Sequence, residues 1–323
     1  SGPYARGVAT ARLAEACVPF PDRWARHLNP LRQRPRRPIA GAGYGRDRIS
    51  MRGRLAGLAA ALWLSSCAPA APVAQAQTDT PTIVSLNPCL DAILVEIAGP
   101  EQVLALSHYS RDPGGSSIPA GVARRYGVTG GTAEEVIALQ PDLVLASIFL
   151  PQPTRLALER AGLTVATFGS PATVAESVAQ VREVAALAGH AEQGEALAAR
   201  IAAPTPQTGT PIDALLWQEG EIVAGEQTLI AELLRQEGFT SHAAARGLGQ
   251  ADRVSLERVL SDPPRVLLIA GDAPGQRHPL LEAQHKRMLI ADFNPALIYC
   301  GGPTIPRTRA RLRAIRAEAE RRP

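Results

Sequence analysis

A helix-and-strand pattern that occurs twice limits the possible folds of this chain more than any other feature. The two segments are TAEEVIALQPDLVL (132–145) and SLERVLSDPPRVLL (255–268), so the second begins 123 residues after the first. Each has a Thr or Ser that can cap a helix, an acid in the first turn, a proline break and an apolar run. The repeat predicts two lobes of the same construction.

Apolar runs alternate with amphipathic segments on both sides of this repeat. A near-continuous apolar run such as 143–148 is typical of a strand buried in a parallel sheet. We expect strands at 83–86, 103–107, 143–148, 164–168, 212–217 and 266–270. Helices are expected at 90–98, 132–139, 154–161, 228–236 and 256–260, with a helical stretch at 173–203 interrupted at Gly189 and a last helix from about 304. This order predicts an α/β fold with doubly wound parallel sheets.

Length and charge distribution limit the class of protein. A chain of 323 residues is long enough for about two domains, and 46% hydrophobic residues can form a substantial core. The net charge of +4 comes from residues 1–76, which contain 12 arginines and 3 acidic residues, so the rest of the chain is mildly acidic. We therefore expect no nucleic-acid partner.

Residues 51–76 have the composition of an export signal. Met51 is followed by two arginines, the apolar run 55–64 and the lipobox LSSC, in which Cys67 would be acylated. Cleavage after the A-x-A site at 74–76 is the second option, and the apolar run is too short to span a bilayer. A buried helix would leave the flanking arginines unexplained. We expect residues 1–50 to be an upstream or disordered extension and the remaining chain to be exported.

The sequence lacks the common motifs of catalysis and metal binding. There is no G-x-G-x-x-G after a strand and no G-x-x-x-x-G-K-[ST]. The six histidines are scattered without H-x-x-x-H spacing, so no metal site is expected. GVTGG (127–131) precedes a predicted helix and is either a turn or an anion site. We expect that the protein is not an enzyme; a two-lobe transferase is the alternative from another functional class.

Four segments carry a family resemblance: IVSLNP (83–88), GTAEEVIALQPDLVL (131–145), the stretch 254–269 and YCGGP (299–303). Together they resemble the periplasmic substrate-binding proteins of ABC importers for ferric siderophores, haem and cobalamin, over roughly residues 81–320. The resemblance implies the helical-backbone type of periplasmic binding protein, in which a single helix joins two Rossmann-like lobes that hold the ligand between them.

The resemblance also implies domain boundaries and a function. An N-terminal lobe at 81–172, a helical connector at 173–206 and a C-terminal lobe at 208–323 are expected, although residues 190–203 are short for the joining helix. The protein would capture an iron complex, a siderophore or haem, and deliver it to the membrane subunits of an ABC importer. Cobalamin is the alternative ligand.

The same resemblance implies where and in what form the protein works. It would act in the periplasm or at the outer face of the cytoplasmic membrane, as a monomer. The metal would belong to the transported chelate, so the protein needs no cofactor of its own.

A receptor for a bulky chelate needs aromatic walls and a few polar anchors. Candidate residues follow strand ends that would face the cleft. They are Asn87, Tyr109, Arg111 and Phe149 in the first lobe, and Trp217, Glu219 and Tyr299 in the second. Each aromatic residue has core packing as its alternative role. Arg111 would pair either with an anionic ligand or with Asp112 and solvent.

Cys89 and Cys300 are the two cysteines of the expected folded region. In the implied fold both lie on loops that face the cleft, so we include them among the ligand-site residues. They are two buried thiols, a disulfide that joins the lobes, or soft ligands for a bound metal or a thiol-reactive ligand. Free cysteine is commonly buried, which favours the first interpretation.

Glu134 and Glu257 occupy matching positions in the two repeats, each in the first turn of a predicted helix. An acid there complements the helix dipole. In the resembled family, residues at these two places form salt bridges with arginines of the importer. We therefore predict that Glu134 and Glu257 dock the protein on its membrane subunits.

Overall fold

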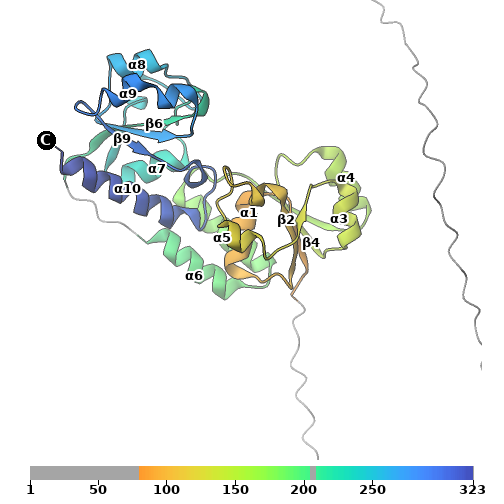
Figure 1. The fold of residues 1–323 in the computed structure, drawn as a ribbon. Helices are drawn as coiled ribbons and strands as arrows, with labels where there is room; N and C mark the ends of the chain where they lie inside the picture. Colours follow the sequence, from red (N-terminus) through yellow and green to blue (C-terminus); the bar gives the residue numbers. More distant parts are fainter. Residues whose placement is uncertain (1–79, 204–208, 323) are drawn as a thin grey trace, which may run out of the picture. The chain divides into compact units, whose positions relative to one another are not determined.

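The computed structural model describes residues 80–203 and 209–322. The expected extension at 1–50, the expected signal at 51–76 and Cys67 therefore lie outside the described residues. Two parallel sheets, each with its own helices, form the part of the chain that the structure describes (Figure 1).

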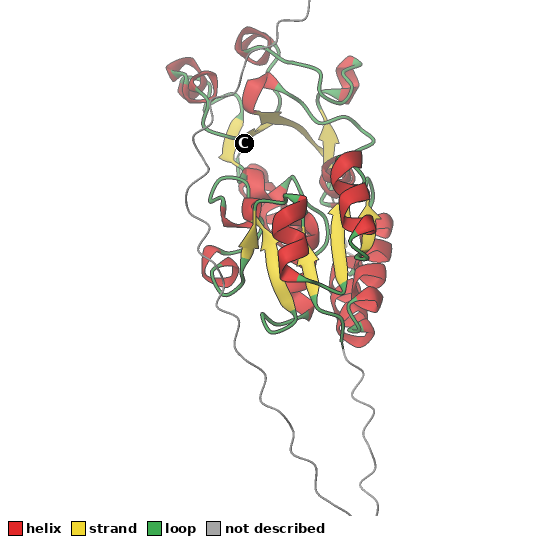
Figure 2. Cartoon of the chain, turned by 90° about the vertical axis from the view of Figure 1, so that its right-hand side faces the viewer, coloured by secondary structure: helices red, strands yellow, loops and turns green. Residues whose placement is uncertain are grey.

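The sheet of the N-terminal lobe has five parallel strands. Their order is β3 (Val128–Thr129), β2 (Val103–Ser107), β1 (Ile83–Ser85), β4 (Leu143–Ser147) and β5 (Thr164–Phe168). The connecting helices are α1 (Pro88–Ile97), α2 (Ala120–Ala123), α3 (Ala133–Leu139) and α4 (Gln152–Arg160). Alternate strand residues pack on opposite faces: Ile83 belongs to the core that includes α1, whereas Val84 packs with α3 and α4. Helices consequently cover both faces (Figure 2).

The sheet of the C-terminal lobe has four parallel strands. Their order is β7 (Phe239–Ser241), β6 (Ile212–Gln218), β8 (Val266–Ala270) and β9 (Leu289–Asp292). The helices are α7 (Leu229–Gln236), α8 (Leu256–Ser261), α9 (Pro279–Glu282) and α10 (Thr304–Glu320). The order β2-β1-β4-β5 of the first sheet thus matches β7-β6-β8-β9 of the second.

The repeated sequence pattern accounts for this match. Thr132 caps α3 because its hydroxyl accepts a hydrogen bond from the backbone N–H of Glu135, at 3.3 Å. Ser255 caps α8 in the same way, through the N–H of Arg258 at 3.4 Å. Each capped helix is followed by a buried strand, β4 or β8, that pairs with the first strand of its lobe. The prediction of two lobes with parallel sheets is confirmed.

Short elements were not predicted. Strands β3, β7 and β9 have only two to four residues, too few to show a period. Five 3₁₀ segments were also missed: η1 (His108–Arg111), η2 (Glu219–Glu221), η3 (Ala244–Arg246), η4 (Pro274–Arg277) and η5 (Pro295–Leu297).

The segment between the lobes contains two helices. α5 (Val174–Leu187) and α6 (Ala191–Ala202) are separated by Gly189, whose φ of +78° favours glycine. The two helices pack closely, since a Cβ on Gly194 would lie 2.3 Å from the Cβ of Ala185. The joining helix is α6, which has only 12 residues, because it is the last described helix before the C-terminal sheet and packs on both α5 and α10.

A buried arginine connects α10 with α6 and α7. The Arg309 guanidinium donates hydrogen bonds to the carbonyl oxygens of Ile201, at 2.6 Å, and Ala203, at 3.0 Å. It also donates to the side-chain oxygen of Gln236, at 2.6 Å, and lies 3.8 Å from the buried carboxylate of Glu237. The last carbonyls of a helix have no partner within the helix, so Arg309 satisfies the end of α6. Figure 1 shows α10 running beside α6.

We expect Arg309→Met to lower the free energy of unfolding by about 3 kcal/mol, because it removes the donor to the buried Ile201 carbonyl and one of the two cations beside the buried Glu237 carboxylate. Urea denaturation followed by circular dichroism measures this change. The matched control is Arg200→Met, which removes the exposed ion pair with Glu96 and should cost less than about 1 kcal/mol. Equal losses in the two variants would contradict the role of Arg309.

A second buried polar group, Asp91, lies inside the N-terminal lobe. One oxygen of its carboxyl group accepts hydrogen bonds from the backbone N–H of Ser107, at 2.9 Å, and the hydroxyl of Ser110, at 2.6 Å. Asp91 is on α1, and its partners are on β2 and η1, so it ties these elements together. Burial raises the pKa of Asp91 to about 8, against the lowering effect of hydrogen bonds from Ser110, Ser85 and Ser107.

This raised pKa predicts a pH-dependent stability. The folded protein keeps the Asp91 proton up to about pH 8, whereas the unfolded chain loses it near pH 4, so stability falls as pH rises between these values. Asp91→Asn should remove this slope and raise the free energy of unfolding at pH 8 by at least about 2 kcal/mol. Urea denaturation at pH 4 to 9 measures it. Glu183→Gln, at an exposed position of α5, is the control and should keep the wild-type slope.

Candidate functional site

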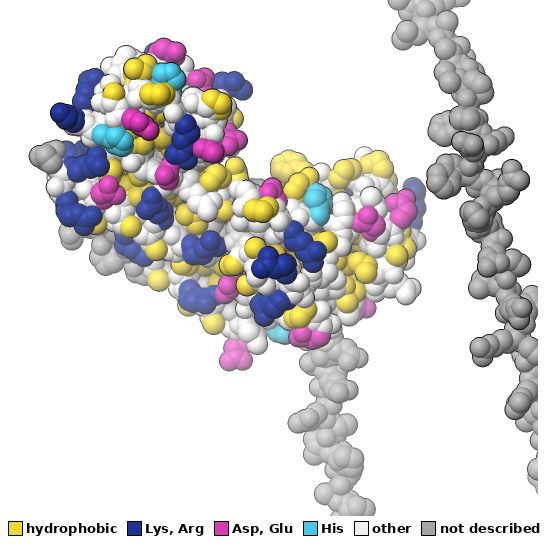
Figure 3. Space-filling model, viewed as in Figure 1, with side chains coloured by type: hydrophobic (Ala, Val, Ile, Leu, Met, Phe, Trp, Pro, Cys, Tyr) yellow, Lys and Arg dark blue, Asp and Glu magenta, His cyan; other side chains and the backbone are white. Residues whose placement is uncertain are grey.

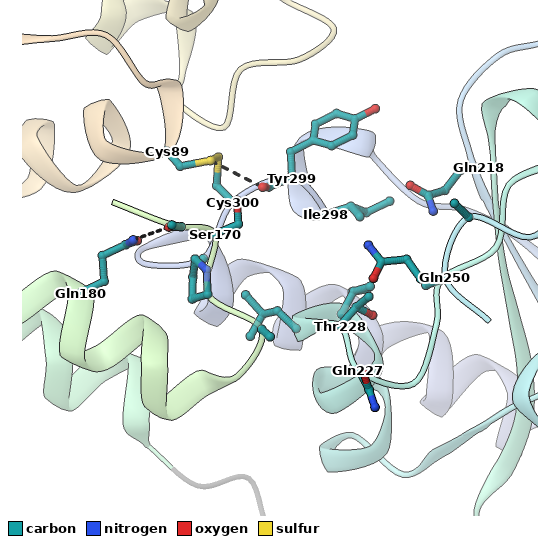
Figure 4. A pocket seen from close by; sticks show the side chains of 18 of the residues that line it. Cys89, Ser170, Gln180, Gln218, Gln227, Thr228, Gln250, Ile298, Tyr299 and Cys300 are labelled. Atoms are coloured by element: carbon teal, nitrogen blue, oxygen red, sulfur yellow. Dashed lines mark hydrogen bonds between the residues drawn. A yellow bond between two sulfur atoms is a disulfide. The ribbon is translucent and has the colours of Figure 1, made fainter. Parts of the chain in front are cut away.

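A cavity of about 470 Å³ among the described residues receives residues from both lobes. The N-terminal lobe contributes the start of α1, the loop 169–172 after β5, and α5. The C-terminal lobe contributes the end of β6, the segments 222–224 and 227–230, and the segments 250–251 and 298–301. The carboxyl ends of parallel strands are the usual place for ligands in such sheets, so this cavity is the candidate ligand site (Figure 4).

The start of α1 forms one wall of the cavity. The side-chain oxygen of Asn87 accepts hydrogen bonds from the backbone N–H groups of Cys89, at 2.8 Å, and Leu90, at 3.3 Å. Pro88 follows as the first helical residue, which suits its fixed φ. Asn87 lines the cavity as predicted from its position after β1, and its oxygen is used to cap the helix.

The cavity lining carries no Asp, Glu, Lys, Arg or His side chain. Its polar side chains are amides and hydroxyls, with one phenol, that of Tyr299, which is 58% exposed. Sequence reasoning found Asn87 and Tyr299 but missed the glutamines Gln180, Gln218, Gln227 and Gln250. Figure 4 shows Gln218 and Gln250 on the side opposite Cys89. The Gln180 amide donates to the Gly169 carbonyl at 2.8 Å.

Cys89 and Cys300 form a disulfide in the cavity wall, with their Cα atoms 5.1 Å apart. The favoured interpretation, two separate buried thiols, is therefore wrong, and the oxidised pair also excludes the metal-ligand interpretation for this state. The disulfide alternative is confirmed. The preference for burial describes single cysteines, whereas here the start of α1 and the segment before α10 bring two sulfur atoms together.

The structure contradicts the assignment of Trp217 to the ligand site. Its side chain is fully buried in the C-terminal core, and its indole N–H donates to the carbonyl of Val254 at 2.8 Å. Successive strand residues point to opposite faces, so the next residue, Gln218, reaches the cavity instead. The alternation of side chains between the two faces of β6 was the signal that could have shown that Gln218, and not Trp217, lines the cavity.

Four other predicted residues lie elsewhere. Tyr109 and Phe149 are exposed, by 56% and 79%, after β2 and β4, strands that flank β1 in the sheet. The Arg111 guanidinium donates to the carbonyl of Tyr126 at 2.7 Å. Glu219 lines a separate hollow of about 580 Å³ and accepts a hydrogen bond from the N–H of Asp272 at 3.2 Å. None of the four lines the 470 Å³ cavity, and a ligand contact for them stays a prediction.

Both candidate docking glutamates are exposed in the first turn of their helices. A hydrogen bond from Ser255 is the main cause that lowers the pKa of Glu257. In the first lobe the neighbouring Glu135, not Glu134, accepts hydrogen bonds from Thr129 and Gly130, at 2.8 and 2.6 Å. Glu134 has no such bond among the described residues, so it is available at the surface.

Within residues 80–203 and 209–322, no group of three His, Cys, Asp or Glu residues could hold a metal ion. Over the same residues, no helix is long and apolar enough to cross a membrane. Acidic and basic side chains are interspersed over the face that Figure 3 shows.

Solved structures share the fold. The haem-binding protein RhuT from Roseiflexus sp. RS-1 has a TM-score of 0.59 at 21% identity, covering 74% of this chain and 98% of that one. HutB of Vibrio cholerae, also haem-binding, has a TM-score of 0.58 at 16% identity, covering 72% and 98%. The vitamin B12-binding protein BtuF of Vibrio cholerae has a TM-score of 0.56 at 18% identity, covering 75% and 99%. A search of curated proteins finds no match.

Sequence identities of 16–21% to solved structures show the fold but not the family. A match to a family model shows the family. The model described as "Periplasmic binding protein" matches residues 83–288, more than half of the chain, and spans both sheets. The match agrees with the two parallel-sheet lobes and with a cavity lined by both. The chain therefore belongs to the periplasmic binding protein family, the non-enzymatic solute-binding proteins that serve ABC importers.

Proposed function

We propose that the protein binds haem in the cavity and delivers it to the membrane subunits of an ABC importer. The observation that carries this proposal is Tyr299. It is the one side chain of the cavity lining that can offer an oxygen anion to iron, because the lining has no carboxylate, imidazole or free thiol. Tyrosine is an established axial ligand of haem iron.

The rest of the lining suits a large planar ligand. Leu229, Ile230 and Ile298 are apolar residues of the C-terminal lobe in the lining, and a macrocycle needs such surface. The cavity offers no cation to pair with the haem carboxylates, so these groups would extend into solvent. The haem-binding proteins RhuT and HutB share the fold, which supports the proposal. The iron arrives with the ligand, and the protein holds no cofactor of its own.

Cobalamin is the second candidate, and the amides of the cavity favour it. Gln218, Gln227 and Gln250 line the cavity, and their side chains make no hydrogen bond with another described residue. A corrin ring carries primary amides at its edge, and unpaired amides can both donate to and accept from them. The uncharged lining also suits a ligand without carboxylates, and BtuF shares the fold.

Titration with ferric haem and with cyanocobalamin, followed by absorbance, distinguishes the two ligands. We expect ferric haem to bind and Tyr299→Phe to weaken it at least about tenfold, because the phenol supplies the iron ligand. Tyr126→Phe, which removes a hydroxyl that donates to the Ala98 carbonyl outside the cavity, is the matched control and should bind as wild type.

Two other results of this titration would contradict haem binding. Cyanocobalamin binding that is lost in Gln218→Leu/Gln250→Leu and kept in Tyr299→Phe would select the second candidate. Binding of a ferric siderophore and of neither macrocycle would overturn both.

Delivery is proposed to use Glu134 and Glu257 as the contacts with the membrane subunits. They lie on corresponding helices, one in each lobe, and are exposed outside the cavity lining. Exposed charges act mainly on association rate and on salt dependence, so docking would weaken as salt rises.

We expect Glu134→Ala/Glu257→Ala to keep ligand affinity and to reduce uptake at least about tenfold, because both long-range contacts are removed. Uptake by cells that carry the importer and binding to the purified membrane subunits measure this. The control is Glu135→Ala, in the same turn as Glu134, which should leave uptake unchanged. Normal uptake by the double variant would contradict the docking assignment.

Export is proposed to use residues 51–76, with Cys67 acylated and the mature protein a monomer. The arrangement of arginines, apolar run and lipobox supports this. The intact mass of the protein from its native membrane should correspond to a chain that begins at an acylated Cys67. A mass that retains residues 1–50 would contradict it.

A further inference from the structure

The disulfide joins two distant parts of the chain in the wall of the cavity. Cys89 is in the first turn of α1, and Cys300 lies shortly before α10, 211 residues later. Both cysteines line the cavity, and Cys89 is only half-buried. Figure 4 shows the bond next to Tyr299.

The segment around Tyr299 is fixed on both sides by other contacts. Before it, the carbonyl of Leu297 accepts a hydrogen bond from Thr308 at 2.9 Å. After it, the N–H of Gly302 donates to the hydroxyl of Ser177 at 2.7 Å. Between these points the disulfide attaches Tyr299 and Cys300 to the N-terminal lobe, and the Cys89 sulfur lies 3.5 Å from the Tyr299 carbonyl oxygen.

We propose that the disulfide is a redox clamp on the ligand cavity, opened by a dithiol reductant. In the closed form the bond holds Tyr299 over the cavity. In the open form residues 298–300 are free to move, and the cavity holds its ligand more weakly. The ligand part of this proposal rests on the proposed function, whereas the redox part does not.

The reaction balances with a dithiol as the electron donor. One reductant thiolate attacks the half-buried Cys89 sulfur, the S–S bond breaks, and Cys300 leaves with the electron pair and takes a proton. The second reductant thiol then attacks the mixed disulfide and releases Cys89 as a thiolate. The start of α1 favours a negative charge at that position. The products are two protein thiols and an oxidised reductant.

The first experiment counts accessible thiols in the full chain carrying Cys17→Ser and Cys67→Ser, so that only the pair remains. Iodoacetamide labelling under native conditions, read by intact mass, should give no adduct before dithiothreitol and two adducts after it. Adducts that form only after the protein is unfolded would overturn the clamp, because the bond would then be out of reach of a reductant.

The second experiment measures hydrogen exchange of the same protein, oxidised and reduced, without ligand. Exchange in 298–300 should become at least about tenfold faster on reduction, since the segment loses its link to the N-terminal lobe. The amides of β1 should exchange at the same rate in both forms. Equal exchange of 298–300 in the two forms would overturn the clamp.

The third experiment tests the ligand with Cys89→Ser/Cys300→Ser added, which avoids exposing ferric haem to a reductant. Affinity for ferric haem or cyanocobalamin, whichever the parent binds, should fall at least about tenfold. An unchanged affinity would overturn the effect on ligand. If the protein that keeps the disulfide binds neither ferric haem nor cyanocobalamin, the proposed function is wrong. The hydrogen-exchange experiment then still tests whether the disulfide holds residues 298–300 in place.

Discussion

The Arg309 guanidinium determines how the helices of the described chain meet. Its hydrogen bonds reach the last carbonyls of α6 and a side chain of α7, while its own backbone belongs to α10. α6 is the helix that leads from one lobe toward the other. Its end therefore has to be fixed if the two lobes are to keep their relative positions. A single buried cation does this for three helices. The start of α10 is then placed where Arg307 donates to the Ser117 carbonyl of the N-terminal lobe, at 2.6 Å.

Local patterns predicted most of the fold, and contacts between distant residues explain most of the errors. The strands 103–107, 164–168 and 266–270 were predicted with the bounds that the structure has, since each is a distinct apolar run. β3 and β7 form because a neighbouring strand, β2 or β6, offers them backbone hydrogen bonds. The hydrophobic period of a two- or three-residue segment cannot show that such a neighbour exists. The disulfide joins the start of α1 to a segment 211 residues later, and no local feature of either cysteine indicates that the two are in contact.

The candidate site was predicted less completely for the same reason. Asn87, Cys89, Tyr299 and Cys300 follow or precede recognisable elements, so their position near the strand ends could be inferred. Trp217 and Gln218 are neighbours at the end of one strand, and the choice between them depends on which face of β6 is covered. Gln250 lies in a loop without any pattern, and only the folded chain brings it to the cavity. The charged residues lie outside that lining, so selectivity would rest on shape and on amide dipoles.

The bond between Cys89 and Cys300 also affects the unfolded chain. It closes a loop, residues 89–300, that contains every described strand except β1 and every described helix except α10 and the first residue of α1. In the chain-entropy model, a crosslink over a loop of this length lowers the conformational entropy of the unfolded chain. This raises the free energy of the unfolded chain by about 5 kcal/mol. An oxidised chain that unfolds therefore keeps the beginning of one lobe beside the end of the other. Refolding then begins with a contact between residues 211 apart already made, so the chain searches its conformations as a closed ring and not as an open polymer.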